Sequence, residues 1–367
     1  MAVSDAGLYI HIPFCAVKCR FCHFATFPGL RGEIPRYLRA LSMELAGWKG
    51  MALDSVYVGG GTPTLLSEEE FRVLFATVRR VFHLEPGAEI TVECEPAGTG
   101  REKLQDLRAF GVNRVSLGLQ AGQDGLLKKM GRRHTAADFA RAFRAAREAG
   151  FPNLNVDLIY GLPGQTLADW KETIDFALAL GPEHLSAYAL DVDERSALGC
   201  SGYRPDDDLQ AEMYASASQR LESEGYRHYE ISNFARAGYE CRHNLRYWKN
   251  LPVLGAGVSA AGFYGGARWR NTERLSDYLE RVETGLSPVA ETERLEGRKR
   301  AEEDLILSLR LSDGARIDSE AEGFFGQVLS RFIAEGSLQK CGEDRIRMTR
   351  SGWLASNVLF RELLSAD

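Results

Sequence analysis

Short apolar runs alternate with longer amphipathic stretches from residue 8 to about residue 190. The apolar runs are partly β-branched or aromatic, as expected of strands buried on both faces of a parallel sheet. Between them apolar residues recur with helical spacing, and Ser67 with Glu70 forms a capping box at the start of one such stretch. Six β/α units in succession predict an α/β fold whose parallel sheet is either doubly wound or curled into a barrel. The predicted strands are Leu8–Ile12, Ser55–Val58, Glu89–Val92, Arg114–Leu119, Asn153–Leu158 and His184–Leu190, and the predicted helices include Pro35–Trp48, Ala136–Ala149 and Leu167–Leu180.

The pattern changes after residue 200. Asp206–Glu224 predicts a helix, and residues 226–271 form an aromatic stretch punctuated by glycines. A cluster of charges at 291–300 leads into a final part predicted as two helices, a strand at Arg345–Thr349 and a closing helix, an order typical of a small winged-helix-like domain. Because residues 298–367 hold 11 basic and 12 acidic residues, a packing or lid role is favoured over DNA binding.

Composition and charge exclude several classes of protein. Of 367 residues, 44% are hydrophobic and 26% charged, which is ordinary for a globular chain. The balance of 45 Lys+Arg against 51 Asp+Glu gives a net charge of −6, so nucleic acid is not an expected partner. No apolar run approaches the ~18 residues of a membrane span, and the first residues lack the pattern of a signal peptide. We therefore expect a cytoplasmic protein with no transmembrane segment.

Three of the seven cysteines, Cys15, Cys19 and Cys22, crowd into a C-x3-C-x2-C spacing just after the first predicted strand. Three thiolates on one loop can converge on a metal cluster, but they leave one iron of a [4Fe–4S] cube open to an outside ligand. The alternative is a zinc site with His23 as the fourth ligand, although structural zinc sites usually pair two separated ligand clusters. The remaining cysteines are predicted to be buried structural thiols: Cys94, Cys200, Cys241 and Cys341.

This spacing resembles that of the radical S-adenosylmethionine (SAM) superfamily. In that superfamily the amino and carboxylate groups of SAM chelate the open iron, and an electron from the cluster cleaves SAM to a 5′-deoxyadenosyl radical. The resemblance implies a partial (β/α)6 barrel at 1–200 with the cluster and SAM at the carboxyl ends of the strands. It further implies a region at 201–296 that covers the barrel mouth, followed by the small winged-helix-like domain at 297–367.

Further SAM contacts are expected at the ends of later strands. The Gly-rich turn Gly59–Thr64 lets the backbone pass close to a ligand, although a plain tight turn would also explain it. Carboxylates can accept from ribose hydroxyls or the adenine edge, and a guanidinium can hold the SAM carboxylate. Each polar residue taken singly is equally explained as solvated or structural. Residue by residue, the resemblance implies SAM contacts at Tyr9, Phe21, Gly60, Gly61, Thr62, Glu93, Gln120, Arg132 and Asp157.

The closest resemblance lies in the coproporphyrinogen III dehydrogenase branch of the superfamily, which holds two kinds of relative. The dehydrogenase itself typically carries a fourth Cys two residues after the third and an N-terminal extension. Here that position is Phe24, and only seven residues precede the first predicted strand. The second kind is the HemW family of haem chaperones, whose pattern is matched at His11–Phe24 and again at His243–Trp248. The favoured function is therefore a haem chaperone that binds a [4Fe–4S] cluster, SAM and haem and passes haem to an acceptor protein; the alternative is a dehydrogenase or another radical SAM enzyme acting on a tetrapyrrole.

The distal motif, His243-Asn244-Leu245-Arg246-Tyr247-Trp248, has two interpretations. Neutral imidazole is the commonest axial ligand of haem, and flanking aromatic rings could stack on a porphyrin, which makes His243 a candidate haem ligand. Alternatively, the motif is a packed cluster that seats the C-terminal domain on the core. The chain also departs from the family pattern at three places: His23, Glu95 and Ala261.

Overall fold

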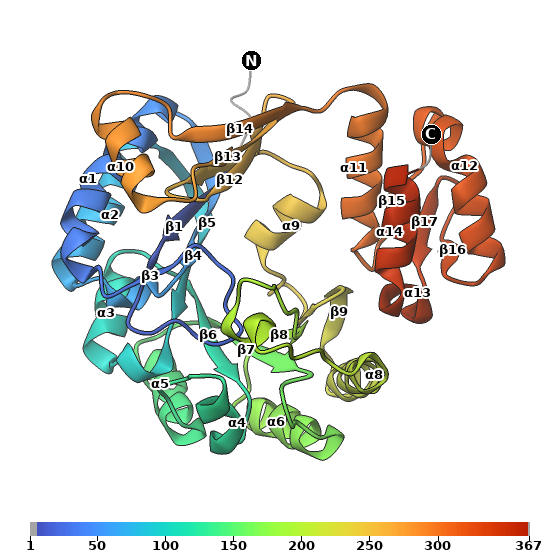
Figure 1. The fold of residues 1–367 in the computed structure, drawn as a ribbon, viewed down its shortest axis with the longest axis horizontal. Helices are drawn as coiled ribbons and strands as arrows, with labels where there is room; N and C mark the ends of the chain where they lie inside the picture. The colour runs from blue at the N-terminus through green and yellow to red at the C-terminus, as the bar shows by residue number, and fades with distance from the viewer. Residues whose placement is uncertain (1–5, 366–367) are drawn as a thin grey trace.

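The computed structural model describes residues 6–365 and is built on a twelve-stranded sheet with the order β14-β13-β12-β11-β1-β4-β5-β6-β7-β8-β10-β9 (Figure 1). Neighbouring strands from β1 to β8 in this order are parallel, and the sheet curves into a partial barrel, so the predicted α/β class and the (β/α)6 barrel are confirmed. The six barrel strands are β1 (Ala6–Ile12), β4 (Ala52–Gly60), β5 (His83–Cys94), β6 (Arg114–Gln120), β7 (Asn153–Tyr160) and β8 (His184–Ala189).

Helices cover the convex face of the sheet, and local signals start several of them. The predicted capping box is present: Ser67 Oγ accepts from the Glu70 amide at 3.3 Å, and the Ser67 amide donates to the Glu70 carboxylate at 2.7 Å. The sequence pattern missed α3, α4 and α7, and after the barrel α9 (Arg242–Trp248) and α10 (Leu275–Glu283); all five have nine residues or fewer. No helix within residues 6–365 is long and apolar enough to cross a membrane. The helices up to the end of the barrel are α1 (Ile34–Leu45), α2 (Glu68–Val81), α3 (Arg101–Ala109), α4 (Asp124–Lys129), α5 (Ala136–Glu148), α6 (Leu167–Ala179), α7 (Ala197–Cys200) and α8 (Asp207–Ser223).

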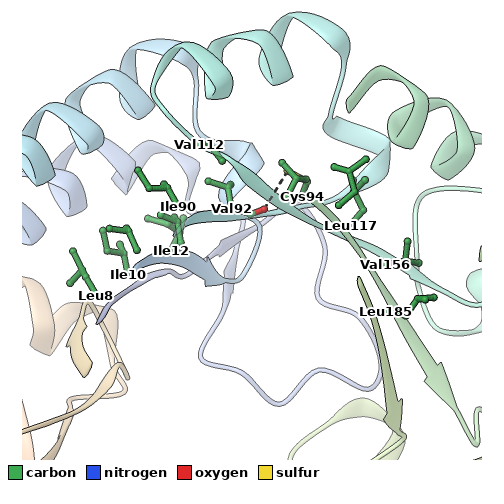
Figure 2. Close-up of a cluster of buried hydrophobic side chains, with 14 of the residues drawn as sticks. Leu8, Ile10, Ile12, Ile90, Val92, Cys94, Val112, Leu117, Val156 and Leu185 are labelled. Carbon is green, nitrogen blue, oxygen red and sulfur yellow. Dashed lines mark hydrogen bonds between the residues drawn. The ribbon is translucent and has the colours of Figure 1, made fainter. Parts of the chain in front are cut away.

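The barrel strands are buried on both faces, as predicted, but the two faces differ in chemistry. Leu8, Ile10 and Ile12 of β1 alternate with Tyr9 and His11, and the other barrel strands alternate in a similar way. Successive strand residues point to opposite faces of a sheet, so the apolar set packs beneath the helices and the other set faces the barrel interior. Figure 2 shows part of the apolar set, with Ile90, Val92 and Cys94 from β5, Leu117 from β6, Val156 from β7 and Leu185 from β8.

Both edges of the parallel sheet are extended by strands from the region after residue 200, and all of these except β11 run antiparallel to the strand they extend. The first strand, β1, pairs on its other side with β11, which is parallel to it. Helix α9 (Arg242–Trp248) lies on the concave side of the sheet, where it contacts β4 (Figure 1). The remaining elements of this region are β9 (Arg227–Glu230), β10 (Asn233–Ala235), β11 (Val253–Ala256), β12 (Ala261–Tyr264), β13 (Ala267–Asn271), α10 (Leu275–Glu283) and β14 (Val289–Arg294).

The last part of the chain forms a small sheet covered by helices; the predicted two helices, strand and closing helix are present, together with two short strands and a short helix that were not predicted. Its strand order is β15-β17-β16, and Trp353 packs against His228 with ring centroids 4.5 Å apart. This contact joins the C-terminal unit to the end of the large sheet. The boundaries at 200 and 296 remain predictions. The elements are α11 (Gly297–Leu309), β15 (Ala315–Arg316), α12 (Ser319–Ala334), β16 (Leu338–Lys340), β17 (Arg345–Met348), α13 (Arg350–Leu354) and α14 (Ser356–Ser365).

Trp170 of α6 packs between the barrel and its outer helices. Its side chain is fully buried, and its indole N–H donates to the Met213 carbonyl at 2.8 Å. We expect Trp170→Ala to lower the free energy of unfolding by about 3–5 kcal/mol, because it leaves a large cavity and removes the buried hydrogen bond to the Met213 carbonyl. Denaturant melts checked by circular dichroism measure this. The exposed neighbour Lys171 supplies the control, since Lys171→Ala should change stability by less than about 0.5 kcal/mol.

Candidate active site

A cavity of about 510 Å³ lies at the carboxyl ends of the barrel strands. This is where parallel β/α folds bind their ligands, and the volume is in the range of small-molecule sites. Eleven of the thirteen residues predicted for the site line it, whereas Tyr9 and His243 do not. The eleven are Cys15, Cys19, Phe21, Cys22, Gly60, Gly61, Thr62, Glu93, Gln120, Arg132 and Asp157.

The cysteine loop is fixed to the rest of the barrel by backbone hydrogen bonds. The loop follows β2 (Phe14–Cys15), which pairs with β3 (Phe27–Pro28). The Arg20 amide donates to the Met130 carbonyl at 3.1 Å, and the Leu198 amide donates to the Arg20 carbonyl at 2.9 Å. The loop is thereby attached at its centre to the segments that carry α4 and α7. This attachment holds all three thiols against one cavity.

Two of the thiols accept hydrogen bonds from other predicted site residues. Thr62 Oγ1 donates to Cys15 Sγ at 3.4 Å, and Arg132 Nη1 donates to Cys19 Sγ at 3.5 Å. Burial raises the pKa of Cys15 and of Cys22. Since bound metal favours the thiolate, these thiols would release protons on metal binding.

The donor set suits an iron–sulfur cluster, because the three thiols of the loop line one cavity. Within residues 6–365, no three His, Cys, Asp or Glu side chains converge closely enough to hold one metal ion. A [4Fe–4S] cube accepts each thiolate on a different iron, so three thiols spread along one loop wall suit it. Cys15, Cys19 and Cys22 could therefore hold a cube whose fourth iron faces the cavity.

The prediction that the other four cysteines are all buried was wrong. Cys94 and Cys241 are buried, but Cys200 is exposed and Cys341 is partly exposed. Cys200 ends the one-turn helix α7 on the surface, and Cys341 follows the short strand β16. The buried residues of these two elements are Leu198 and Leu338, and the cysteines lie at other positions.

The Gly-rich turn needs glycine at two positions because the backbone passes so close to its neighbours. Gly60 has φ +107°, and a Cβ there would lie 2.5 Å from the His11 ring. A Cβ on Gly61 would lie 2.8 Å from the carbonyl oxygens of Ile12 and Phe14. This close approach allows two backbone hydrogen bonds: the Gly61 amide donates to the Ile12 carbonyl at 2.9 Å, and the Thr62 amide donates to the Phe14 carbonyl at 2.8 Å. The turn is thus bonded directly to the strand that leads into the cysteine loop.

Two carboxylates face the cavity from β5 and β7, the two strands on either side of β6. Glu93 accepts from the Tyr57 hydroxyl at 2.9 Å and from the Gly60 amide at 3.0 Å. Asp157 accepts from Ser116 at 2.7 Å and from Asn155 at 2.8 Å. Desolvation raises the pKa of Glu93 to about 7, and the Asp157 charge adds to this shift. Burial likewise raises the pKa of Asp157.

Gln120 and Arg132 form the far wall of the cavity. Gln120 has φ +70°, an uncommon value for a non-glycine residue, at the end of β6. Arg132 Nη2 donates to the Gly118 carbonyl at 3.3 Å while Nη1 reaches Cys19. The guanidinium thus links the end of β6 to the cysteine loop and presents its charge to the cavity.

The sequence pattern missed several cavity residues, among them Tyr57, Ser116 and Tyr188. Each lies on the interior face of its strand, in register with Tyr9, Glu93 and Ile159 respectively. The alternation of apolar and polar positions within each strand was the signal that could have identified them.

Tyr9 and His243 do not line the cavity but pack beside Tyr57, which does. Tyr9 stacks on Tyr57 with ring centroids 6.2 Å apart. His243 is 1% exposed and stacks on Tyr57 at 5.4 Å, with its Nδ1 3.1 Å from Ser55 Oγ. The predicted SAM contact of Tyr9 and the predicted haem contact of His243 remain predictions. In this structure the His243 imidazole has no open face for a large ligand.

Comparison with known proteins agrees with this geometry. Residues 9–177 match the family model of the Radical SAM superfamily. The chain is 36% identical to "Heme chaperone HemW" of Bacillus subtilis, over 97% of this chain and 98% of the relative. It is 38% identical to "Heme chaperone HemW" of Mycobacterium tuberculosis, over 98% of this chain and 94% of the relative.

A solved structure of coproporphyrinogen III oxidase (HemN) from Escherichia coli, a radical SAM enzyme, is similar over nearly the whole chain. Its TM-score is 0.87 and its identity 25%, covering 99% of this chain and 91% of that structure. This similarity extends through the C-terminal unit.

The raised pKa of Glu93 makes the folded protein less stable as the pH rises. Its folded-state pKa of about 7 lies above the ordinary 4.5, so the stabilisation from the neutral carboxyl is full below pH 4.5 and is lost as pH rises through 7. We expect the melting temperature of Glu93→Gln to rise relative to that of the wild type between those values. The amide fits because the Tyr57 hydroxyl can accept from it instead of donating.

The control is Glu69→Gln, whose carboxylate is exposed at 63% on α2. Its melting temperature should follow that of the wild type across the same range. A constant difference between Glu93→Gln and wild type from pH 5 to pH 8 would contradict the raised pKa.

Proposed function

Because the chain belongs to the HemW family of radical SAM proteins, we propose that it is a haem chaperone that holds a [4Fe–4S] cluster and SAM and passes haem to an acceptor protein. The full-length similarity to two haem chaperones carries this proposal. It is supported by a single cavity that collects the three loop cysteines and the residues proposed to contact SAM. A cytoplasmic location and a protein acceptor belong to the same proposal.

Within the cavity, Cys15, Cys19 and Cys22 would hold the cluster, and SAM would bind its open iron. When bound, the reduced cluster supplies the electron that cleaves SAM. The amides of Gly60, Gly61 and Thr62 all donate within the protein, so this turn offers carbonyl oxygens, which suit the SAM ammonium group.

Other residues of the cavity would fix the remainder of SAM. Arg132 presents a guanidinium that can pair with the SAM carboxylate. Glu93 and Asp157 present acceptors for ribose hydroxyls or the adenine edge, and Gln120 offers both a donor and an acceptor beside them. Phe21 adds an apolar surface on the cysteine loop.

The mouth of the cavity suits a large apolar ligand that carries carboxylates. Val17, Phe24 and Tyr188 line the cavity while 50%, 55% and 40% exposed, which is unusual for large apolar side chains gathered at one place. Lys18 and Arg133 also line it and could pair with propionates. We therefore place haem at this mouth.

A radical SAM enzyme acting on coproporphyrinogen III is the second candidate, because the chain shares its fold with the HemN structure from end to end. In such an enzyme, hydrogen abstraction by the 5′-deoxyadenosyl radical would precede loss of CO2. Phe24, at the position of the dehydrogenase's fourth cysteine, favours the chaperone.

Cys19→Ala should abolish cluster binding, because two thiolates do not hold the cube firmly. After anaerobic reconstitution, iron and labile sulfide should fall to background and the visible absorbance of the cluster should disappear. Cys200→Ala is the matched control, since that thiol is exposed and lies outside the cavity lining, and it should leave iron and sulfide unchanged. A normal cluster spectrum in Cys19→Ala, or zinc without sulfide in the wild type, would refute the assignment.

The chaperone and the enzyme differ in their products. With cluster, SAM, reductant and coproporphyrinogen III, we expect mass spectrometry to find slow, substrate-independent 5′-deoxyadenosine and intact porphyrinogen.

In a haem titration followed by absorbance, Phe24→Asp should weaken haem binding by about tenfold, because it removes an apolar contact and adds a negative charge near the propionates.

Leu286→Asp is the control for this titration, because Leu286 is 63% exposed but lies outside the cavity lining. Its haem affinity should equal that of the wild type. Substrate-dependent 5′-deoxyadenosine together with a decarboxylated porphyrinogen would make the protein an enzyme instead.

A further inference from the structure

Two motifs far apart in the sequence meet at one tyrosine in the middle of the barrel. Tyr57 lies on the interior face of β4, between the amino half of the barrel, which α9 fills, and the cavity at the carboxyl end. The His243 ring of α9 stacks on the Tyr57 ring with centroids 5.4 Å apart and planes 29° apart. Tyr57 therefore has one contact toward α9 and another toward the cavity.

The side of Tyr57 that faces the cavity is bonded to the predicted SAM contacts. Its hydroxyl donates to Glu93 Oε1 at 2.9 Å, and the other oxygen of that carboxylate accepts from the Gly60 amide at 3.0 Å. A Cβ on Gly59 would lie 2.8 Å from the Glu93 carboxyl carbon, so the carboxylate is packed against the start of the Gly-rich turn. The position of the Tyr57 ring thus helps to determine where Glu93 and the turn lie.

The His243 ring is itself held firmly from below. Its Nδ1 lies 3.1 Å from Ser55 Oγ, and its backbone amide donates to Glu89 at 3.1 Å. The same carboxylate accepts from the Arg242 amide at 3.1 Å, so it caps the start of α9. A second edge-on ring, Tyr247, lies 5.4 Å from His243. The ring is fixed on three sides and presents its face to Tyr57.

The His243 imidazole is neutral and stacks on Tyr57 through the face of its ring. Burial, with the Arg246 charge adding to it, lowers the pKa of His243 to about 3, so the ring is uncharged. Its Nε2 makes no hydrogen bond to any described residue, and its side chain is 1% exposed. These features suit stacking, and they leave no room beside Nε2 for a porphyrin in this structure.

We propose that His243 is a positioning residue of the SAM site: by stacking on Tyr57 it holds the hydroxyl that orients Glu93 and the Gly-rich turn, and it is not a ligand of haem iron. The proposal rests on the proposed binding of SAM in the cavity. It assigns the distal motif to the floor of that site. Through this contact α9 supports the cavity without touching its contents.

The test measures SAM and haem binding separately on the full-length protein with its cluster reconstituted. Equilibrium dialysis should show SAM affinity weakened about three- to tenfold in His243→Ala, the effect of losing one aromatic pair. Haem affinity and cluster absorbance should match the wild type. His243→Phe keeps a ring face on Tyr57 and should restore most of the SAM affinity.

His228→Ala is the matched control for burial. That imidazole is 6% exposed and stacks at 4.0 Å on Phe234, but it lies at the contact with the C-terminal unit and not below the cavity. Its SAM affinity should stay at the wild-type value. An equal loss in this variant would overturn the proposal by showing a general effect of damaging the fold.

Tyr57→Phe supplies a second route if His243→Ala does not fold. It keeps the stacked ring and removes only the hydroxyl, so SAM affinity should fall while cluster content stays constant. The loss caused by His243→Ala should be smaller in the Tyr57→Phe background, because both act through one contact. Fully additive losses would overturn the proposal.

Two further outcomes separate this inference from the proposed function. Weakened haem binding with unchanged SAM affinity in His243→Ala would overturn the inference and return His243 to the role of axial ligand. Failure of the reconstituted wild type to bind SAM at all would overturn the proposed function itself, before any variant is compared.

Discussion

The interior face of the barrel carries polar side chains that must be satisfied where water is largely excluded, and the rest of the structure depends on how this is done. Buried polar groups without partners cost about 1–3 kcal/mol each, so the nearly fully buried side chains of Glu89, Arg114, Asn155 and His184 need partners within the protein. Asn155 and His184 satisfy each other at 2.6 Å. Glu89 instead requires donors that come from α9, about 150 residues later in the chain. The need of the Glu89 carboxylate for donors is therefore met by the helix that fills this part of the barrel.

This requirement divides the barrel into two halves with different properties. In the amino half, α9 donates to Glu89 and fills the interior. In the carboxyl half, Glu93 and Asp157 receive only part of their possible bonds from the protein and are left facing a cavity. The same alternation of residues along each strand thus produces a packed floor and an open site above it. Tyr57 stands at the boundary and belongs to both.

Much of the fold could be predicted from the sequence because its signals are local. The six strand cores, the Ser67 capping box and the helices at 136–149 and 167–180 each depend on neighbours a few residues away. The short helix α9 could not be found in this way. It has seven residues, the residue before it (Cys241) does not cap it, and the carboxylate that does, Glu89, lies in a distant strand, as does Ser55.

Part of the candidate site could also be predicted from local residue patterns, and part could not. The cysteine loop and the polar ends of strands carry recognisable residue types, and the structure brings eleven of those residues to one cavity. Tyr57 was missed because a tyrosine inside an apolar strand is ordinarily a core residue. Tyr9 and His243 do not line this cavity but lie beside Tyr57, a contact between β1, β4 and α9 that the spacing of motifs does not reveal, and their predicted ligand contacts remain predictions.

The position of β1 in the sheet has a consequence for how the chain acquires its structure. This strand pairs with β4 on one side and with β11 on the other, and the second partner lies near residue 254. During synthesis, β1 must wait with an unpaired apolar edge until most of the chain has emerged from the ribosome. Such edges attract other strands, and contacts so distant in sequence form slowly. A nascent chain of this protein is therefore most exposed to aggregation, and most dependent on assistance from other proteins, before residues 242–256 have joined the barrel.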